Sequence, residues 1–118
     1  MKDGFHHQKL PDHSTLLCGH TPPDDVGFST QALQIWYNHQ EGPWRDGPAH
    51  AHTQSDECFI VLKGRLVVQV DDERYTIGPR EFCCFRRGVF HRILEVNGPV
   101  ETLMIRAPSK DDKVYQPG

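Results

Sequence analysis

Short apolar runs separated by turn-forming residues recur from about residue 32 to residue 107, and no segment keeps a helical period over ten or more residues. Residue types alternate at 32–40, and further apolar runs lie at 66–70 and 100–105. Asp71-Asp72 is typical of a hairpin tip, and Gly78-Pro79 of a turn. Short strands at regular spacing predict an all-β sandwich or barrel, whose closure protects the sheet edges.

The chain of 118 residues is long enough for one hydrophobic core and too short for two. We therefore expect a single domain with three parts. Residues 1–30 form an irregular N-terminal arm, with turn formers at Pro22-Pro23-Asp24-Asp25 and one short strand near 15–18. Residues 31–107 form the barrel, and residues 108–118 form a charged surface tail.

Composition narrows the classes of partner. Charged residues make up 25% of the chain and the formal net charge is -3, which does not indicate a nucleic-acid surface. No apolar run approaches the roughly 20 residues that span a membrane, and residues 1–7 lack an apolar signal core. We expect a cytoplasmic protein, whose cysteines (Cys18, Cys58, Cys83 and Cys84) are buried thiols and not disulfides.

Four side chains have the chemistry and spacing of a metal site. His50 and His52 are one residue apart, and on a strand such residues point to the same face. Glu57 follows a polar loop, and His91 begins a later strand that could close the site from across a barrel. Imidazole nitrogen and carboxylate oxygen are ligands that Fe, Mn, Ni, Zn and Cu all accept, so the metal identity stays open.

These residues resemble the first motif of the cupin superfamily, a group of small jelly-roll barrels also described as double-stranded β-helices. In that motif two histidines one residue apart are followed by a glutamate and then a glycine. His50, His52, Glu57 and Gly64 match it position by position. The resemblance covers about residues 32–107.

The second cupin motif is degraded. Gly88 and His91 match it, while Arg80-Glu81 stands where Gly-Asp is usual. Arg86 replaces a proline, and Glu95 replaces a frequent asparagine. Glu81 keeps the negative charge of the expected aspartate, so we expect it to keep a similar hydrogen-bonding role in its turn.

The resemblance implies one divalent transition metal held by His50, His52, Glu57 and His91. In an octahedral ion this set leaves two positions free for substrate, water or O₂. It implies a metalloenzyme acting on a small organic molecule, first a dioxygenase-type oxidoreductase. The alternatives are a non-redox isomerase, cyclase or lyase, and a non-enzymatic small-ligand-binding module. Similar single-domain cupins pair as homodimers, through sheet edges or an exchanged N-terminal strand.

Strand parity suggests further site residues. Glu95 shares a face with His91 unless a bulge intervenes, so Glu95 and Glu57 are the candidates for proton transfer. The alternative role of Glu95 is a salt bridge at the far end of the barrel. Arg86 and Arg87 would hold an anionic substrate at the mouth or lie solvated on the surface.

Aromatic and thiol side chains are the remaining candidates. Trp36, Tyr37 and Trp44 would line the pocket, or else form core or a dimer interface. Only one of Cys83 and Cys84 can face inward, and we expect it to pack in the core.

Overall fold

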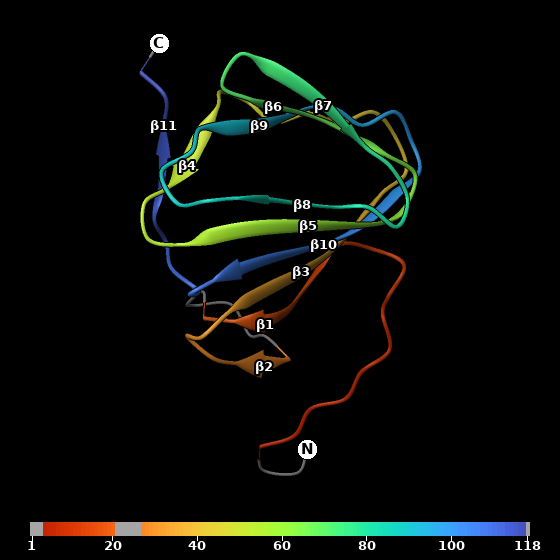
Figure 1. Cartoon of the computed structure of the whole chain (residues 1–118). Coiled ribbons are helices and arrows are strands. Elements are labelled where there is room, and N and C mark those ends of the chain that lie inside the picture. Colours follow the sequence, from red (N-terminus) through yellow and green to blue (C-terminus); the bar gives the residue numbers. More distant parts are fainter. Residues whose placement is uncertain (1–3, 21–26, 118) are drawn as a thin grey trace.

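The computed structural model describes residues 4–20 and 27–117, and these form two facing β-sheets (Figure 1). One sheet has the strand order β2 (Phe28–Ser29), β1 (Thr15–Gly19), β3 (Gln34–Gln40), β10 (Val100–Ala107), β5 (Asp56–Lys63) and β8 (Phe82–Phe85). The other has the order β11 (Lys113–Tyr115), β4 (His50–His52), β9 (His91–Glu95), β6 (Leu66–Val70) and β7 (Glu73–Ile77). The all-β prediction is confirmed.

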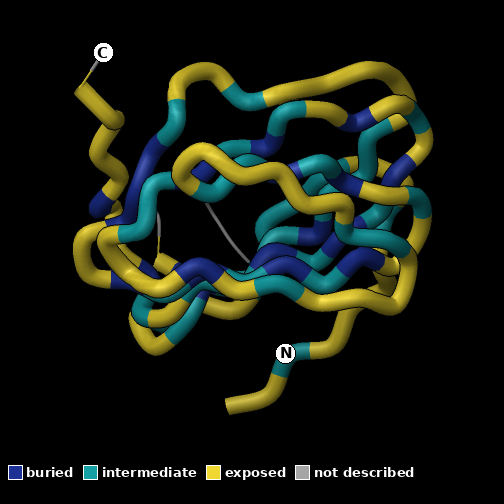
Figure 2. The backbone as a smooth tube through the Cα atoms, turned by 45° about the horizontal axis from the view of Figure 1, so that its top comes forward, coloured by how far each residue is buried: buried dark blue, intermediate teal, exposed yellow. Residues whose placement is uncertain are grey.

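The core lies between the sheets because the strands alternate in polarity. Along β5 every second residue is buried, as expected for a strand that faces the core on one side (Figure 2). In the neighbouring strand Met104 lies directly beside Phe59. The core comprises Phe59, Val61, Leu66, Val68, Phe85, Ile93, Val96, Val100 and Met104.

The turns between strands agree with the sequence. Asp71 takes a positive φ of 54° at the hairpin tip between β6 and β7. Glu81 accepts a hydrogen bond from the backbone N–H of Gly78, the role expected of it. Gly64 has a φ of +77°, and a Cβ on it would lie 2.5 Å from the carbonyl oxygen of Pro99. Only glycine fits at that position of the first motif.

Most of the C-terminal segment is exposed, but it adds a paired strand to the five-stranded sheet, so the sheet extends beyond the predicted end at residue 107. Strand β11 pairs antiparallel with β4, and Val114 lies opposite Ala51. Ser109 and Asp112 are buried. The segment therefore forms one edge of the five-stranded sheet, next to both histidines of the first motif.

The N-terminal arm is more regular than predicted. Strand β1 pairs with β3 of the same chain, and β2 pairs in parallel with β1. The predicted turns at residues 22–25 lie outside the described residues. The described part of the chain contains no long apolar helix of the kind that crosses a bilayer.

Candidate metal centre

Strands from both sheets bring the predicted ligands together. His50 and His52 lie on β4, Glu57 is the second residue of β5, and His91 begins β9 directly opposite His50. All four are buried, and their ligand atoms lie within 4.8 Å of one another. The grouping predicted from the sequence is confirmed, and the cluster has the composition to hold a metal ion.

Two imidazoles are anchored through Nδ1, which turns Nε2 toward the centre. Nδ1 of His52 lies 3.0 Å from a carboxylate oxygen of Asp112, and Nδ1 of His91 lies 3.0 Å from the carbonyl oxygen of Val89. Both partners are acceptors, so each Nδ1 carries the proton that it donates. An anchored Nδ1–H leaves Nε2 free to coordinate, which is the usual arrangement of histidine metal ligands.

The inward nitrogens face Glu57 in a way that suits a cation. Nε2 of His91 lies 2.8 Å from Oε1 of Glu57. Nε2 of His52 finds no hydrogen-bond partner among the described residues, although Oε2 of Glu57 lies 3.3 Å away. Ligands about 2.1 Å from one ion are at most about 4.2 Å apart, so small side-chain rotations would bring all four into range. The donor set fits a transition metal.

The electrostatics keep the ligands ready to coordinate. Burial, followed by the neighbouring His91, lowers the pKa of His50 to about 4, so this ring is neutral at neutral pH. Burial alone would raise the pKa of Glu57. The Arg106 charge opposes burial and helps to hold the pKa of Glu57 well below its usual range. Neutral imidazole and ionised carboxylate are the forms that bind metals.

Arg106 is the charged neighbour of the cluster. Its Nη2 and Nε donate to Oε2 of Glu57 at 2.8 and 3.2 Å, and its Nη1 donates to the side-chain oxygen of Gln34 at 3.0 Å. Gln34 and Glu57 are both buried. Arg106 therefore compensates a carboxylate that would otherwise be buried without a counter-charge.

Asp112 supports the cluster from the C-terminal segment. One of its oxygens contacts His52, and the other accepts the backbone N–H of Gln54 at 2.8 Å. Burial opposes its ionisation, but these contacts prevail and lower the pKa of Asp112. A carboxylate behind a metal-binding histidine fixes the ring and raises its basicity.

Replacing Asp112 with alanine is expected to weaken metal binding by about 10- to 100-fold, because the His52 ring loses its anchor. Isothermal titration of the metal-free protein measures the change. Asp111 is exposed beside it, so Asp111→Ala is the matched control and should bind as the wild type does. Equal affinity in both variants would remove Asp112 from the centre.

A cavity of about 300 Å³ lies against the cluster. His50, Glu57 and His91 form part of its wall. Its apolar wall includes Trp36, Trp44, Phe59, Leu66, Ile93, Val96, Val100 and Met104, and its polar lining includes Asn38, Gln40, Asp46, Thr102, Arg106 and Lys113. The pocket role predicted for the two tryptophans is confirmed. Tyr37 instead donates to Glu101 at 2.5 Å and does not line this cavity.

Among the described residues that line the cavity, Asp46 is the carboxylate outside the ligand set. Its side chain accepts the backbone N–H of Ile93 at 2.7 Å, which holds it beside the strand that carries His91. Burial raises the pKa of Asp46, and the hydrogen bond from Ile93 offsets only part of this. A carboxyl group held in this way beside a metal site is suited to proton transfer.

Glu95 does not face the cluster, contrary to the sequence prediction. Ile93 pairs with Val68, but Glu95 pairs with the adjacent Val67, so Leu94 is an extra residue in β9. This bulge reverses the facing of the residues that follow. Glu95 is exposed and hydrogen-bonds to Asn97 instead.

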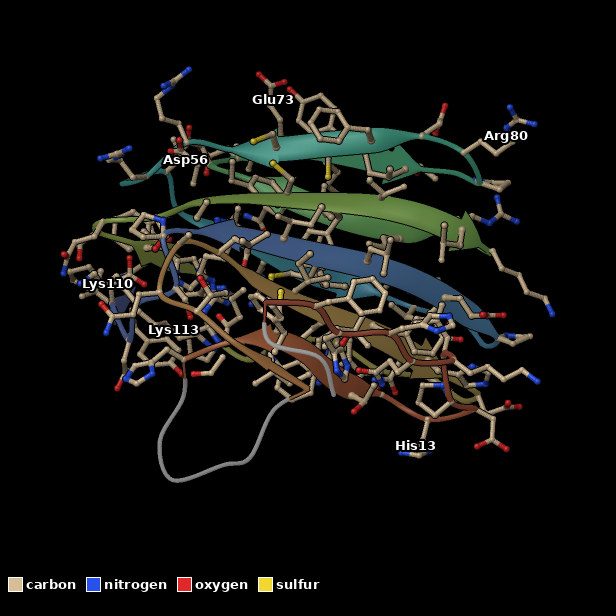
Figure 3. All side chains as sticks on the ribbon, turned by 90° about the horizontal axis from the view of Figure 1, so that it is seen from below. His13, Asp56, Glu73, Arg80, Lys110 and Lys113 are labelled. Atoms are coloured by element: carbon tan, nitrogen blue, oxygen red, sulfur yellow. The ribbon has the colours of Figure 1, made fainter. Side chains whose placement is uncertain are left out.

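The arginines predicted at the mouth lie outside the cavity. Arg86 and Arg87 are exposed, and Arg87 pairs with Asp56 through its backbone N–H at 2.9 Å. The cations that line the cavity are Arg106 and Lys113, the latter at the end of the barrel where Asp56 also lies (Figure 3).

The chain is similar to known cupins in sequence and in fold. Residues 40–106, more than half of the chain, match the family described as the cupin domain. A comparison with curated proteins finds no significant match. A solved cupin protein from Bacteroides fragilis has 16% identity and a TM-score of 0.71, with 98% of this chain and 93% of that chain covered.

Two further solved structures have the same fold. A cupin-2 domain protein from Shewanella frigidimarina has 24% identity and a TM-score of 0.56, over 66% of this chain and 72% of that chain. The DMSP lyase DddQ from Ruegeria pomeroyi has 16% identity and a TM-score of 0.69, over 87% of this chain. The chain spans only about half of the length of that lyase, since the match covers 50% of the lyase chain. At these identities the likeness shows the fold alone.

Proposed function

Since the chain belongs to the cupin domain family, we propose that it is a metal-dependent enzyme acting on a small organic molecule. One observation carries the proposal. Three of the four candidate ligands, His50, Glu57 and His91, line a cavity of about 300 Å³. A structural metal site is closed by protein ligands, whereas a catalytic site borders space for a substrate.

The residues around the cavity favour a substrate with both apolar and polar groups. Trp36, Phe59 and Met104 favour an apolar body, while Asn38 and Thr102, hydrogen-bonded to each other at 3.2 Å, offer polar contacts. A bound transition metal would supply Lewis-acid chemistry and, if it is iron, nickel or copper, O₂ chemistry as well. The dioxygenase version of the proposal rests on the three-His, one-Glu donor set.

A second version, isomerase, cyclase or lyase chemistry, is favoured by Asp46. The Asp46 carboxyl group lines the cavity and is not a candidate ligand, so it is free to take a proton from the substrate or return one. Asp46→Asn should lower such turnover by about 10²- to 10⁴-fold with metal binding retained. Exposed Glu95 provides the control, since Glu95→Gln should leave turnover unchanged. Full activity in Asp46→Asn would remove this role.

Water relaxation tests the shared claim that the metal borders accessible space. Metal-free protein is loaded with Mn²⁺, and the proton relaxation rate of water is measured before and after adding acetylacetone, a small enolic chelator. We expect an enhanced rate that falls as acetylacetone displaces exchangeable water. An unenhanced rate in fully loaded protein would indicate a closed site and contradict the enzyme proposal. Oxygen uptake by the iron, nickel and copper forms with acetylacetone then separates the two versions.

A further inference from the structure

Two cysteines face each other on the six-stranded sheet. Cys58 on β5 and Cys84 on β8 are direct partners in the antiparallel register. Their Sγ atoms lie 2.8 Å apart, and both residues are free thiols. Contrary to the expectation of buried thiols, Cys84 is exposed and Cys58 half-buried, whereas Cys83 packs against the core as predicted for the inward cysteine.

The backbone already has the separation that a disulfide requires. Directly opposed residues of an antiparallel pair have Cα atoms about 4.5 or 5.5 Å apart, and disulfides span about 4.4–6.8 Å. Adjacent Cys83 and Cys84 would strain the backbone if bonded. Among the described cysteines, the pair Cys58 and Cys84 is therefore the one poised for a bond.

We propose that Cys58 and Cys84 are an oxidation site, which a small organic disulfide converts into an intramolecular disulfide. The Cys84 thiolate attacks one sulfur of the small disulfide, so a mixed disulfide forms and one small thiolate leaves. Cys58 then loses its proton to solvent and attacks Sγ of Cys84, which expels the second small thiolate. Two electrons pass from the two cysteines to the small disulfide, which leaves as two thiols.

The order of attack follows from exposure. Cys84 is open to solvent, while Cys58 is half-buried. Cys84 is therefore the better first nucleophile. Once Cys84 carries the adduct, the neighbouring Cys58 thiol is within reach to resolve it.

The bond would tie the edge strand β8 to the strand that carries a candidate metal ligand. Cys58 follows Glu57, and Cys84 precedes Phe85, whose ring stacks on His91 at 4.0 Å between centroids. A disulfide also restricts the unfolded chain, so oxidation should raise the thermal midpoint by about 5 °C or more.

The test treats the reduced full-length protein with dithiobis(nitrobenzoate), a small aromatic disulfide. The Cys18→Ser, Cys83→Ser double variant, which keeps only the facing pair, should release both equivalents of coloured thiol and retain no adduct. Its intact mass should fall by two hydrogen atoms. In the wild type, peptide mapping should find Cys58 linked to Cys84. Adding Cys58→Ser should leave a stable adduct on Cys84.

Three results would overturn the proposal. In the first, the wild type keeps an adduct on Cys84 while Cys58 stays reduced. In the second, the linked peptides contain Cys18 or Cys83. In the third, the disulfide joins two chains, which non-reducing electrophoresis would reveal. None of these outcomes depends on the bound metal or on enzymatic activity.

Discussion

Replacing His52 with alanine is expected to weaken metal binding by more than about 100-fold. Loss of a ligand should cost more affinity than loss of Asp112, the carboxylate that orients this ligand. His52 is 2% exposed, and its Nε2 is the buried nitrogen without a hydrogen-bond partner among the described residues. The β-sheets should persist, because the apolar core does not include this ring. Metal titration gives the affinity, and circular dichroism checks the fold.

The matched control is His13→Ala. His13 projects from the surface with its side chain 72% exposed (Figure 3), so its removal should leave metal affinity unchanged. A His52→Ala protein that binds metal as tightly as His13→Ala would overturn the ligand assignment. Loss of metal binding in both variants would point to a surface site instead.

Replacing Arg106 with methionine is expected to destabilise the metal-free protein by about 3–5 kcal/mol, because it leaves the buried Glu57 carboxylate without its cation. Methionine keeps much of the apolar stem, so lost packing contributes little. Added metal should restore part of the stability, since a bound cation takes over the compensating charge and stabilises the folded state by mass action. Urea unfolding with and without metal measures both effects.

Arg87→Met is the control for Arg106→Met. Arg87 pairs with Asp56 at 3.6 Å, but both side chains are solvent-accessible, 57% and 37% exposed. Such a pair is worth at most about 1 kcal/mol. Equal small losses in the two variants would show that Glu57 does not depend on Arg106. If Arg106→Met loses much stability and added metal restores none of it, then Arg106 does not act through the metal centre.

His50 and His52 were predictable as a pair because strand alternation places them on one face, whereas Glu57 and His91 joined the predicted set through the resemblance to the cupin motifs. His50 and His52 need only a straight strand to share a face, and β4 provides one. Gly64 follows the last residue of β5, at a point where a Cβ would collide with the backbone of Pro99. The strands were predictable for the same reason, since their apolar residues alternate where one face meets the core.

The predicted facing of Glu95 was wrong because side chains alternate between faces only while the pairing of two strands stays regular. The extra residue Leu94 turns Glu95 outward and buries Val96 instead. No residue type at these positions signals a bulge. The bulge is set by the pairing of β9 with β6, which sequence patterns do not specify.

The supporting charges could not be predicted because their roles come from tertiary contacts. Asp112 lies in a polar segment without periodicity, and its burial depends on β11 pairing with β4. Asp46 lies in a loop rich in proline and glycine, and its position depends on the backbone of Ile93. The sequence contains a weak indication that Arg106 points inward, because Arg106 shares one face of β10 with Thr102 and Met104.

The most direct test of the central claim is the metal content of the protein, measured by elemental mass spectrometry after loading and removal of free metal, with His91→Ala measured in parallel. The four-ligand centre predicts close to one transition-metal ion per wild-type chain and little or none in the variant. A folded wild type that retains no metal, or a His91→Ala protein that retains the full amount, would contradict it.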